Sequence, residues 1–256
     1  MKRVIYVFAA CAGVFFLNAC NETTTNSLAT DTSLDLAVAE IPSEDNETYL
    51  YVTAGSGLSL REFNNLSSEK LAIMPYGTKL KVLSKEDQAT MTVAGIKGAM
   101  NEVEYNHKKG FAFTGYLSKF FPPEEDIRPT IYAEDLKKQF PAVSFTEATG
   151  GSASQPTNTE TLQLPTQEWH EAFFIAQQLY DIPKSFAFPK SKGKDLQTLK
   201  NHKSTPSLWV SELEVERTNN TLQKITYRYA GEGYGSNVTI TKSGEMMKIE
   251  HHTVAD

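Results

Sequence analysis

Histidine is the side chain best suited to acid–base and metal chemistry at neutral pH, and this chain carries five of them. No His-Glu-x-x-His pattern occurs, so the helix-borne zinc site of metalloproteases is not indicated. His170 and Glu171 are adjacent, and neighbouring side chains diverge on a helix, so the two cannot share a metal ion. His251 and His252 fall on a predicted strand, where they would point to opposite faces. We therefore interpret this pair as a frayed C-terminal surface rather than a site.

Glycine-rich segments are the other places where chemistry could be encoded. Gly55-Ser56-Gly57 lacks the spacing of a nucleophile elbow, and the glycines at 231–235 are not followed by a predicted helix, as a phosphate-binding loop requires. We therefore predict no enzymatic activity, no bound cofactor and no metal. An enzyme of another type would need a pocket that converges on His170 or Glu171.

The two cysteines, Cys11 and Cys20, both lie near the N-terminus. A basic start (Met1-Lys2-Arg3) precedes an apolar run over 4–17, and the run ends at Leu17-Asn18-Ala19-Cys20. A charged start and a short apolar run indicate an export signal. The run is shorter than the roughly 20 apolar residues that span a bilayer core. The ending resembles the lipobox of bacterial lipoproteins.

That resemblance implies that residues 1–19 are a signal peptide and that Cys20 becomes the lipidated N-terminus. Its acyl chains, palmitate among them, would then hold the protein to a membrane, since each buried methylene contributes about 0.8 kcal/mol. We expect a location in the cell envelope, in the outer or inner membrane and facing the periplasm. The alternatives are an ordinary secreted protein and one anchored by the apolar run itself.

Processing would leave a mature chain without a free thiol, because Cys11 is removed and Cys20 is acylated. Cysteine catalysis, disulfides and thiolate metal sites are then excluded. The whole chain has 25 basic and 31 acidic residues and a net charge of -6. Loss of Lys2 and Arg3 leaves 23 basic residues and a net charge of -8. An acidic chain without a basic stripe is a poor candidate for binding nucleic acid.

The rest of the chain divides by composition into three parts. Residues 20–46 are polar and predict a flexible tether. Residues 47–121 are rich in strand formers and turn signals. The run Pro122-Pro123-Glu124-Glu125-Asp126 then marks a boundary, since its prolines interrupt both helix and strand, and we interpret its carboxylates as a solvated hinge. A second folded block covers 127–256.

The first block has three motifs in a familiar order. They are Gly57-Leu58-Ser59-Leu60-Arg61, then Gly77-Thr78-Lys79-Leu80-Lys81-Val82, then Gly110-Phe111-Ala112 with Gly115-Tyr116-Leu117. The block resembles a bacterial Src-homology-three domain, which implies a small β-barrel over 47–121. A Trp that many members carry is replaced by Ala99-Met100-Asn101, and residues 92–97 predict an inserted hairpin with its turn at Ala94-Gly95.

The same resemblance implies a binding module, since exported members are commonly linked to peptidoglycan or other cell-wall targets. Aromatic residues of the block would supply a ligand groove. The candidates are Tyr51, Tyr76, Tyr105, Phe111, Phe113 and Tyr116. The competing interpretation of each is an ordinary barrel core residue, because only about half of a strand's residues face inward.

The second block predicts an α+β domain. Apolar spacing indicates helices over 132–140 and 166–180, with Thr166 as the N-cap of the second, and residues 149–160 read as a loop. Strands over 209–217 and 222–229 would pair around an Asn219-Asn220 turn, with Trp209, Leu213 and Val215 inward.

This first hairpin has a register that satisfies both faces of the sheet. It sets Val215 opposite Ile225 and Leu213 opposite Tyr227, with Glu216 opposite Lys224 and Glu212 opposite Arg228. A second hairpin, turning at Ser243-Gly244, would set Val238 opposite Ile249 and Ile240 opposite Met247. Together they predict a four-stranded antiparallel meander with a covering helix, so the expected fold class is mainly β with some α.

Two functions follow as hypotheses. The first is an envelope-anchored, non-catalytic binding module for peptidoglycan or an envelope protein. The alternative is an inhibitor or immunity-type lipoprotein that blocks an envelope enzyme through residues 127–256. An exposed patch of Glu and aromatic residues on the second block would favour the alternative.

Overall fold

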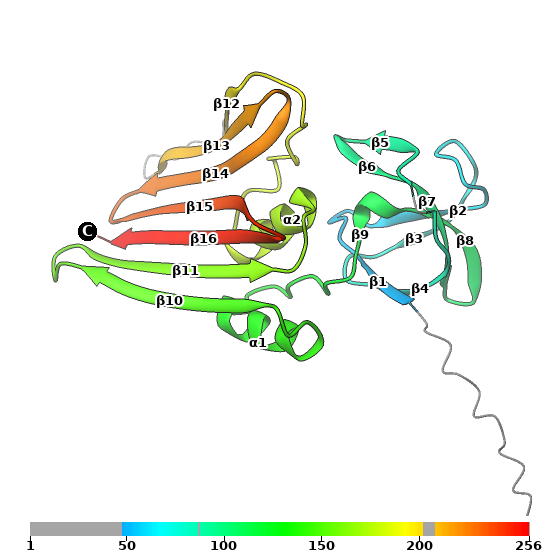
Figure 1. The fold of residues 1–256 in the computed structure, drawn as a ribbon, viewed down its shortest axis with the longest axis horizontal. Coiled ribbons are helices and arrows are strands. Elements are labelled where there is room, and N and C mark those ends of the chain that lie inside the picture. Colours follow the sequence, from blue (N-terminus) through cyan, green and yellow to red (C-terminus); the bar gives the residue numbers. More distant parts are fainter. Residues whose placement is uncertain (1–47, 87, 202–207, 256) are drawn as a thin grey trace, which may run out of the picture. The chain divides into compact units, whose positions relative to one another are not determined.

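The computed structural model describes residues 48–86, 88–201 and 208–255 (Figure 1). The fold is mainly β with some α, as predicted, and the described residues belong to one compact unit. The predicted signal peptide, Cys20 and the tether lie outside the described residues. Within the described ranges, neither helix is long and apolar enough to span a membrane.

The first sheet contains seven antiparallel strands in the order β3-β2-β8-β7-β4-β1-β9. The bounds are β1 (Thr48–Val52), β2 (Leu58–Arg61), β3 (Lys70–Met74), β4 (Lys79–Ser84), β7 (Met100–Tyr105), β8 (Lys108–Phe113) and β9 (Leu117–Ser118), with a short 3-10 helix η1 (Thr114–Tyr116) before β9. The predicted alternation is confirmed, because Leu58 and Leu60 of β2, like Leu80 and Val82 of β4, are buried in one core.

A closed barrel was predicted for this block, but the sheet is open. Its order ends at β3 on one side and at β9 on the other, and these two edges are not hydrogen-bonded to each other. The last strand is only two residues long and pairs with β1 alone through Tyr51 and Val52. The inserted hairpin is confirmed as β5 (Met91–Val93) and β6 (Ile96–Gly98), whose turn residues Ala94 and Gly95 both have positive φ.

The second sheet has seven antiparallel strands rather than four, in the order β10-β11-β16-β15-β14-β13-β12. The bounds are β10 (Ser144–Gly151), β11 (Pro156–Leu164), β12 (Leu196–Lys200), β13 (Leu208–Thr218), β14 (Thr221–Gly231), β15 (Tyr234–Ser243) and β16 (Met246–Ala255). The predicted meander is its centre, β13 to β16. The loop expected at 149–160 instead belongs largely to the β10–β11 hairpin. Thr149, Thr157 and Thr159 all lie in paired strand positions, and the strand preference of threonine outweighs the turn preference of the residues between them.

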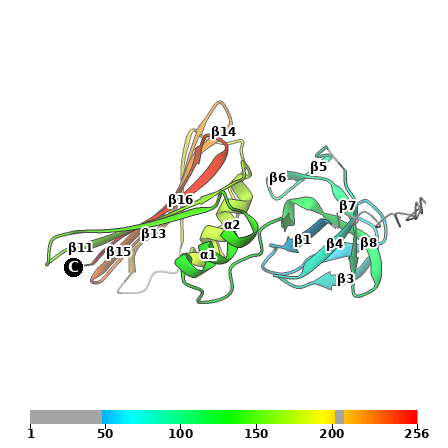
Figure 2. The same cartoon turned by 60° about the horizontal axis from the view of Figure 1, so that its bottom comes forward.

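Helices α1 (Pro129–Gln139) and α2 (Trp169–Leu179) lie on one face of this second sheet (Figure 2). The core between them and the sheet is apolar, with Leu136, Phe173, Leu213 and Ile249 fully or almost fully buried. The wide apolar stripe of the sequence 166–180 is therefore used as predicted, against a sheet.

The first predicted hairpin register is confirmed at all four pairs, and Asn219 and Asn220 form its turn with positive φ. Trp209 was predicted to face inward but is 67% exposed. A register shift between Leu208 and Val210 interrupts the inward–outward alternation of β13 at Trp209.

The second hairpin is shifted by two residues from the prediction. Ile240 pairs with Ile249, and Val238 pairs with His251. The turn is the cause, since Ser243 pairs with Met246 and leaves a two-residue loop whose first residue, Gly244, has a φ of 61°. A two-residue shift preserves the face of every side chain, so the same apolar residues remain buried.

Candidate functional site

A cleft of about 1290 Å³ is the candidate binding site of the described structure. Four of the six predicted groove aromatics line it, namely Tyr51, Tyr76, Phe113 and Tyr116. The remaining two, Tyr105 and Phe111, do not line it and instead pack against the core of the first sheet. The structure thus brings together most of the residues that the sequence selected.

One wall of the cleft comes from the first sheet and the segment after it. Tyr51 belongs to β1, and its ring contacts that of Phe121 edge to face, with ring centroids 6.2 Å apart. The turn 54–57 between β1 and β2 lines the cleft with backbone and small side chains. Gly57 is required in this turn, because its φ is 84° and an added Cβ would lie 2.8 Å from the side chain of Ile73.

Helix α2 supplies the opposite wall through Phe174, Gln177 and Gln178. Phe174 is partly buried at the edge of the core beside Phe173, and its ring also contacts that of Tyr116, with ring centroids 6.0 Å apart. This wall was not predicted. Sequence patterns show that α2 has an apolar face, but they do not show which residues beside that face will meet another part of the chain.

The boundary segment borders the cleft as well. Pro122 and Pro123 are buried, whereas Glu124 and Glu125 are exposed at the rim, as expected for solvated carboxylates. The Tyr76 hydroxyl donates a hydrogen bond to the Pro123 carbonyl at 3.3 Å. Burial raises the pKa of Tyr76 to about 12. Tyr76 is therefore a neutral, partly structural member of the aromatic wall.

Charged groups of both signs surround the cleft. Acidic groups are contributed by Glu124, Glu125 and Asp135, and basic groups by Arg61 and Lys184. Aromatic walls with a few polar and charged groups are typical of sites for small ligands. No group of three or more His, Cys, Asp or Glu side chains suited to a metal ion occurs within the described residues.

Glu171 is a buried carboxylate that joins the first sheet to α2. It accepts a hydrogen bond from the Ser118 hydroxyl on β9 and another from the Thr166 hydroxyl, both at 2.5 Å. Thr166 was predicted as the N-cap of α2, but the cap residue is Glu168, whose backbone N–H donates to the Thr166 hydroxyl. Glu171 does not line the cleft. Its hydrogen bond to Ser118 connects β9 to α2, the helix that supplies one wall of the cleft.

The ring of His170 packs edge to face against that of Phe188, and its Nδ1 lies 3.6 Å from the Glu168 carboxylate. Burial lowers the pKa of His170, and the nearby carboxylates of Glu171 and Glu168 partly oppose that shift. His170 does not line the cleft either. His170 and Glu171, on which a catalytic pocket of the second block was expected to converge, are therefore both absent from the lining of this cleft.

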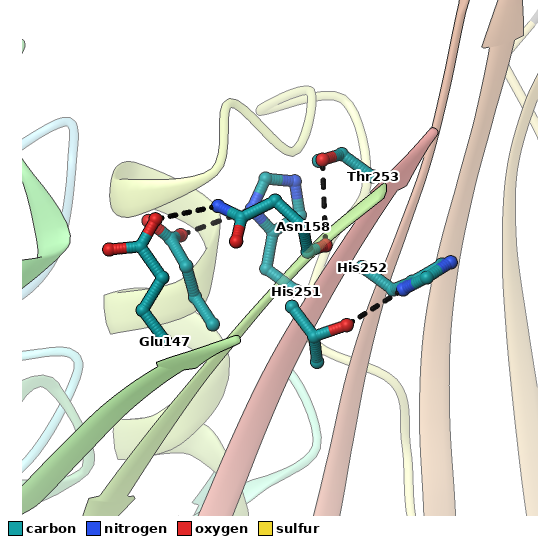
Figure 3. Close-up of polar contacts among 7 residues, drawn as sticks. Glu147, Asn158, His251, His252 and Thr253 are labelled. Carbon is teal, nitrogen blue, oxygen red and sulfur yellow. Dashed lines mark hydrogen bonds and ion pairs between the residues drawn. The ribbon is translucent and has the colours of Figure 1, made fainter. Parts of the chain in front are cut away.

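A second polar cluster lies on the second sheet, across β10, β11 and β16 (Figure 3). His251 Nδ1 is 3.3 Å from Glu160 Oε2, and Asn158 Nδ2 donates to Glu147 at 2.8 Å. His252 contacts Thr159 on the opposite face at 2.9 Å. The predicted frayed surface is wrong, because both histidines lie within the paired strand β16 and are partly buried. Their opposite orientation is as predicted.

Comparisons of the chain with protein-family models, with curated proteins and with solved structures found no match.

Proposed function

We propose that this protein is a lipid-anchored, non-catalytic binding protein of the bacterial cell envelope, and that its cleft binds peptidoglycan. The observation that carries the proposal is the convergence of four sequence-selected aromatic residues on one cleft of about 1290 Å³. The order of motifs that resembles a Src-homology-three domain supports the same class of function. The lipobox-like sequence at Cys20 would place the cleft within reach of the cell wall.

The chemistry of the cleft suits a peptidoglycan fragment. Tyrosine rings present apolar faces for sugar rings together with hydroxyls for hydrogen bonds. A stem peptide carries both amino and carboxylate groups, and the rim offers carboxylates at Glu124 and Glu125 and cations at Arg61 and Lys184. A fragment of two sugars and a short peptide would bury much of its surface in a cleft of this size.

Cosedimentation of the lipid-free protein (residues 21–256) with purified peptidoglycan tests the proposal. Tyr51→Ala removes a cleft residue, and Tyr49→Ala is the matched control, because both tyrosines lie on β1 but Tyr49 does not line the cleft. We expect about tenfold weaker binding for Tyr51→Ala and unchanged binding for Tyr49→Ala. Failure of the unmodified protein to sediment with peptidoglycan would refute the ligand, and equal losses in both variants would refute the cleft.

The anchor requires a separate experiment, because Cys20 lies outside the described residues. Cells given labelled palmitate should incorporate it into the full chain and not into a Cys20→Ser variant. The unmodified chain should fractionate with membranes, and the variant should not. Equal labelling of the two chains would contradict lipidation at Cys20.

The inhibitor alternative rests on a different surface of the second sheet. Trp209 on β13 is 67% exposed and Leu196 on the edge strand β12 is 58% exposed, while β13 also carries Glu212, Glu214 and Glu216. The aromatic side chain is exposed, whereas the three glutamates are half-buried, and Glu214 and Glu216 pair with Arg228 and Lys224. An exposed aromatic side chain beside carboxylates is suited to a basic enzyme such as lysozyme. Inhibition of lysozyme that Trp209→Ala abolishes and Tyr51→Ala preserves would favour this alternative over the cleft.

A further inference from the structure

Tyr180 carries a buried hydroxyl without a hydrogen-bond partner among the described residues. The side chain follows the last turn of α2 and is 8% exposed. Its ring contacts the His251 ring at a tilt of 40°, with centroids 4.4 Å apart, so Tyr180 lies beside the polar residues of the second sheet. A buried hydroxyl without a partner costs about 1–3 kcal/mol, and an ordered water or a ligand is the usual explanation of such an atom.

Asn158 supplies a second unsatisfied group in the same cluster. Its Nδ2 donates to the Glu147 carboxylate at 2.8 Å, and this fixes the orientation of the amide because an ionised carboxylate only accepts hydrogen bonds. The Oδ1 atom is then directed elsewhere, and it is buried without a partner. Asn158 and Glu160 are two residues apart on β11, so they share one face of the sheet.

That face is the one that α2 covers in part. Leu162, which is fully buried under the helices, has the same parity on β11 as Glu160 and Asn158. Figure 3 shows Glu147, Asn158 and His251 on one side of the strands and His252 on the other. The burial decreases outwards from Tyr180, through Glu160 and His251 at about 15% side-chain exposure, to the exposed Glu147. The cluster therefore extends from a buried floor to solvent.

The unsatisfied and charged groups of the cluster are mainly hydrogen-bond acceptors. They comprise the Asn158 amide oxygen and the carboxylates of Glu160 and Glu147, beside the Tyr180 hydroxyl, which can accept or donate. Burial and then the charge of Glu160 raise the pKa of the Tyr180 phenol, in agreement with a carboxylate nearby. The rings of Tyr229 and Tyr234, 5.9 Å apart, lie on the neighbouring strands β14 and β15. Burial also raises the pKa of Tyr234, a hydrogen bond with Ser236 partly opposes that shift, and the charge of Glu160 adds to it.

We propose that this end of the second sheet is a separate binding site for a small organic cation that carries a primary ammonium group. An ammonium is a donor-only group with three N–H bonds, so it complements the acceptors Asn158 Oδ1 and Glu160 while balancing the charge of the carboxylates. Tyrosine faces add a favourable cation–π contribution. A metal ion is a poorer candidate, because no suitable ligand group of three occurs in the described residues.

The site differs from the cleft in residues and chemistry, so the two can be tested independently. Isothermal titration calorimetry of the lipid-free protein with 1,4-diaminobutane should give a dissociation constant on the order of 1 mM, the range expected for a ligand of so few atoms. Butane-1,4-diol has the same length without the charge and should bind at least tenfold more weakly.

Tyr180→Phe removes only the unsatisfied hydroxyl and should weaken binding of the diamine about tenfold or more. Tyr132→Phe is the matched control, since it removes a buried hydroxyl that already donates to the Phe121 carbonyl at 2.8 Å. It should leave diamine binding unchanged, as should the cleft variant Tyr51→Ala. Circular dichroism confirms that each variant is folded.

Three results would overturn the proposal. They are no binding of the diamine, equal binding of diamine and diol, and a Tyr180→Phe variant that binds as well as the unmodified protein. The first would indicate that water alone satisfies these atoms. None of them bears on peptidoglycan binding, which is measured separately.

Discussion

The two sheets are both seven-stranded and antiparallel, yet they are built differently. The strands of the first sheet have at most six residues. Register shifts occur in both sheets, in the pairing of β2 with β3 and of β4 with β7 and in that of β13 with β14. Six of the seven strands in the second sheet have eight residues or more, and helices cover one face. Short strands place loops and aromatic residues around a cleft. Long strands hold polar side chains at fixed spacings, which is how the Asn158–Glu160–His251 cluster arises.

The same contrast appears in two buried tyrosines. Tyr132 on α1 is fully buried, and its hydroxyl donates to the Phe121 carbonyl of the segment that borders the cleft. Tyr180 at the end of α2 is almost as buried, and its hydroxyl has no partner in the described residues. The first hydroxyl contributes to the fold. The second does not, which is the reason to assign it a ligand.

The largest effect is expected from the helix-covered core of the second sheet. Phe173→Ala removes a fully buried ring between α2 and the sheet and should lower the free energy of unfolding by about 3–5 kcal/mol. Urea unfolding followed by tryptophan fluorescence measures it, since both tryptophans, Trp169 and Trp209, belong to this second region. Leu60→Ala in the core of the first sheet is the comparison and should cost about 2–5 kcal/mol. A change below 1 kcal/mol for Phe173→Ala would contradict the packing.

A smaller effect should follow from breaking the connection between the two sheets. Glu171→Leu leaves the hydroxyls of Ser118 and Thr166 without their acceptor, which should destabilise the protein by about 1–3 kcal/mol. Glu124→Leu, at the exposed rim of the cleft, should change stability by less than about 0.5 kcal/mol. Thermal and urea unfolding of the two variants give the comparison. Equal stability would show that Glu171 does not hold α2 against β9.

The tyrosine contrast can be measured without a ligand. Tyr132→Phe should cost about 1 kcal/mol, because the Phe121 carbonyl loses its donor. Tyr180→Phe should be neutral or stabilising, since it removes a hydroxyl without a partner. The difference between the two unfolding free energies is the quantity of interest. A larger loss for Tyr180→Phe would mean that its hydroxyl is already satisfied in the free protein.

Local patterns predicted the parts of the fold that depend on neighbours in sequence. The Asn219-Asn220 turn fixed the β13–β14 register because its flanking residues satisfy both faces at once. The register predicted for the second hairpin was wrong, because its sequence allows two registers that bury the same apolar residues. Only the geometry of the turn at Gly244 distinguishes these registers. Strands β10 and β11 were not predicted, because most of their residues are polar and the sequence shows no clear alternation of apolar and polar side chains.

The candidate sites follow the same rule. Tyr51 and Tyr116 were selected because the motifs of one block mark them, and both line the cleft. Phe174 was not selected, since its contribution depends on how α2 meets the first sheet. The polar cluster was missed for a similar reason, because Tyr180 and His251 are 71 positions apart in sequence and meet only in the folded chain.

The smallest predicted effect concerns pH and the second sheet alone. Burial lowers the pKa of His170 below its ordinary value of 6.5, so the unfolded chain takes up a proton at this residue more readily than the folded one. The stability that the neutral ring contributes is therefore complete above pH 6.5 and is lost as the pH falls through the folded-state pKa. His170→Gln should lose less stability than the unmodified protein between pH 7 and pH 5, as measured by urea unfolding at each pH. His107→Asn is the control, because His107 lies exposed in the β7–β8 turn with a φ of 60°, a conformation that Asn tolerates. If the stability of His170→Gln fell as steeply with acid as that of His107→Asn, burial of His170 would not contribute to the acid sensitivity of this region.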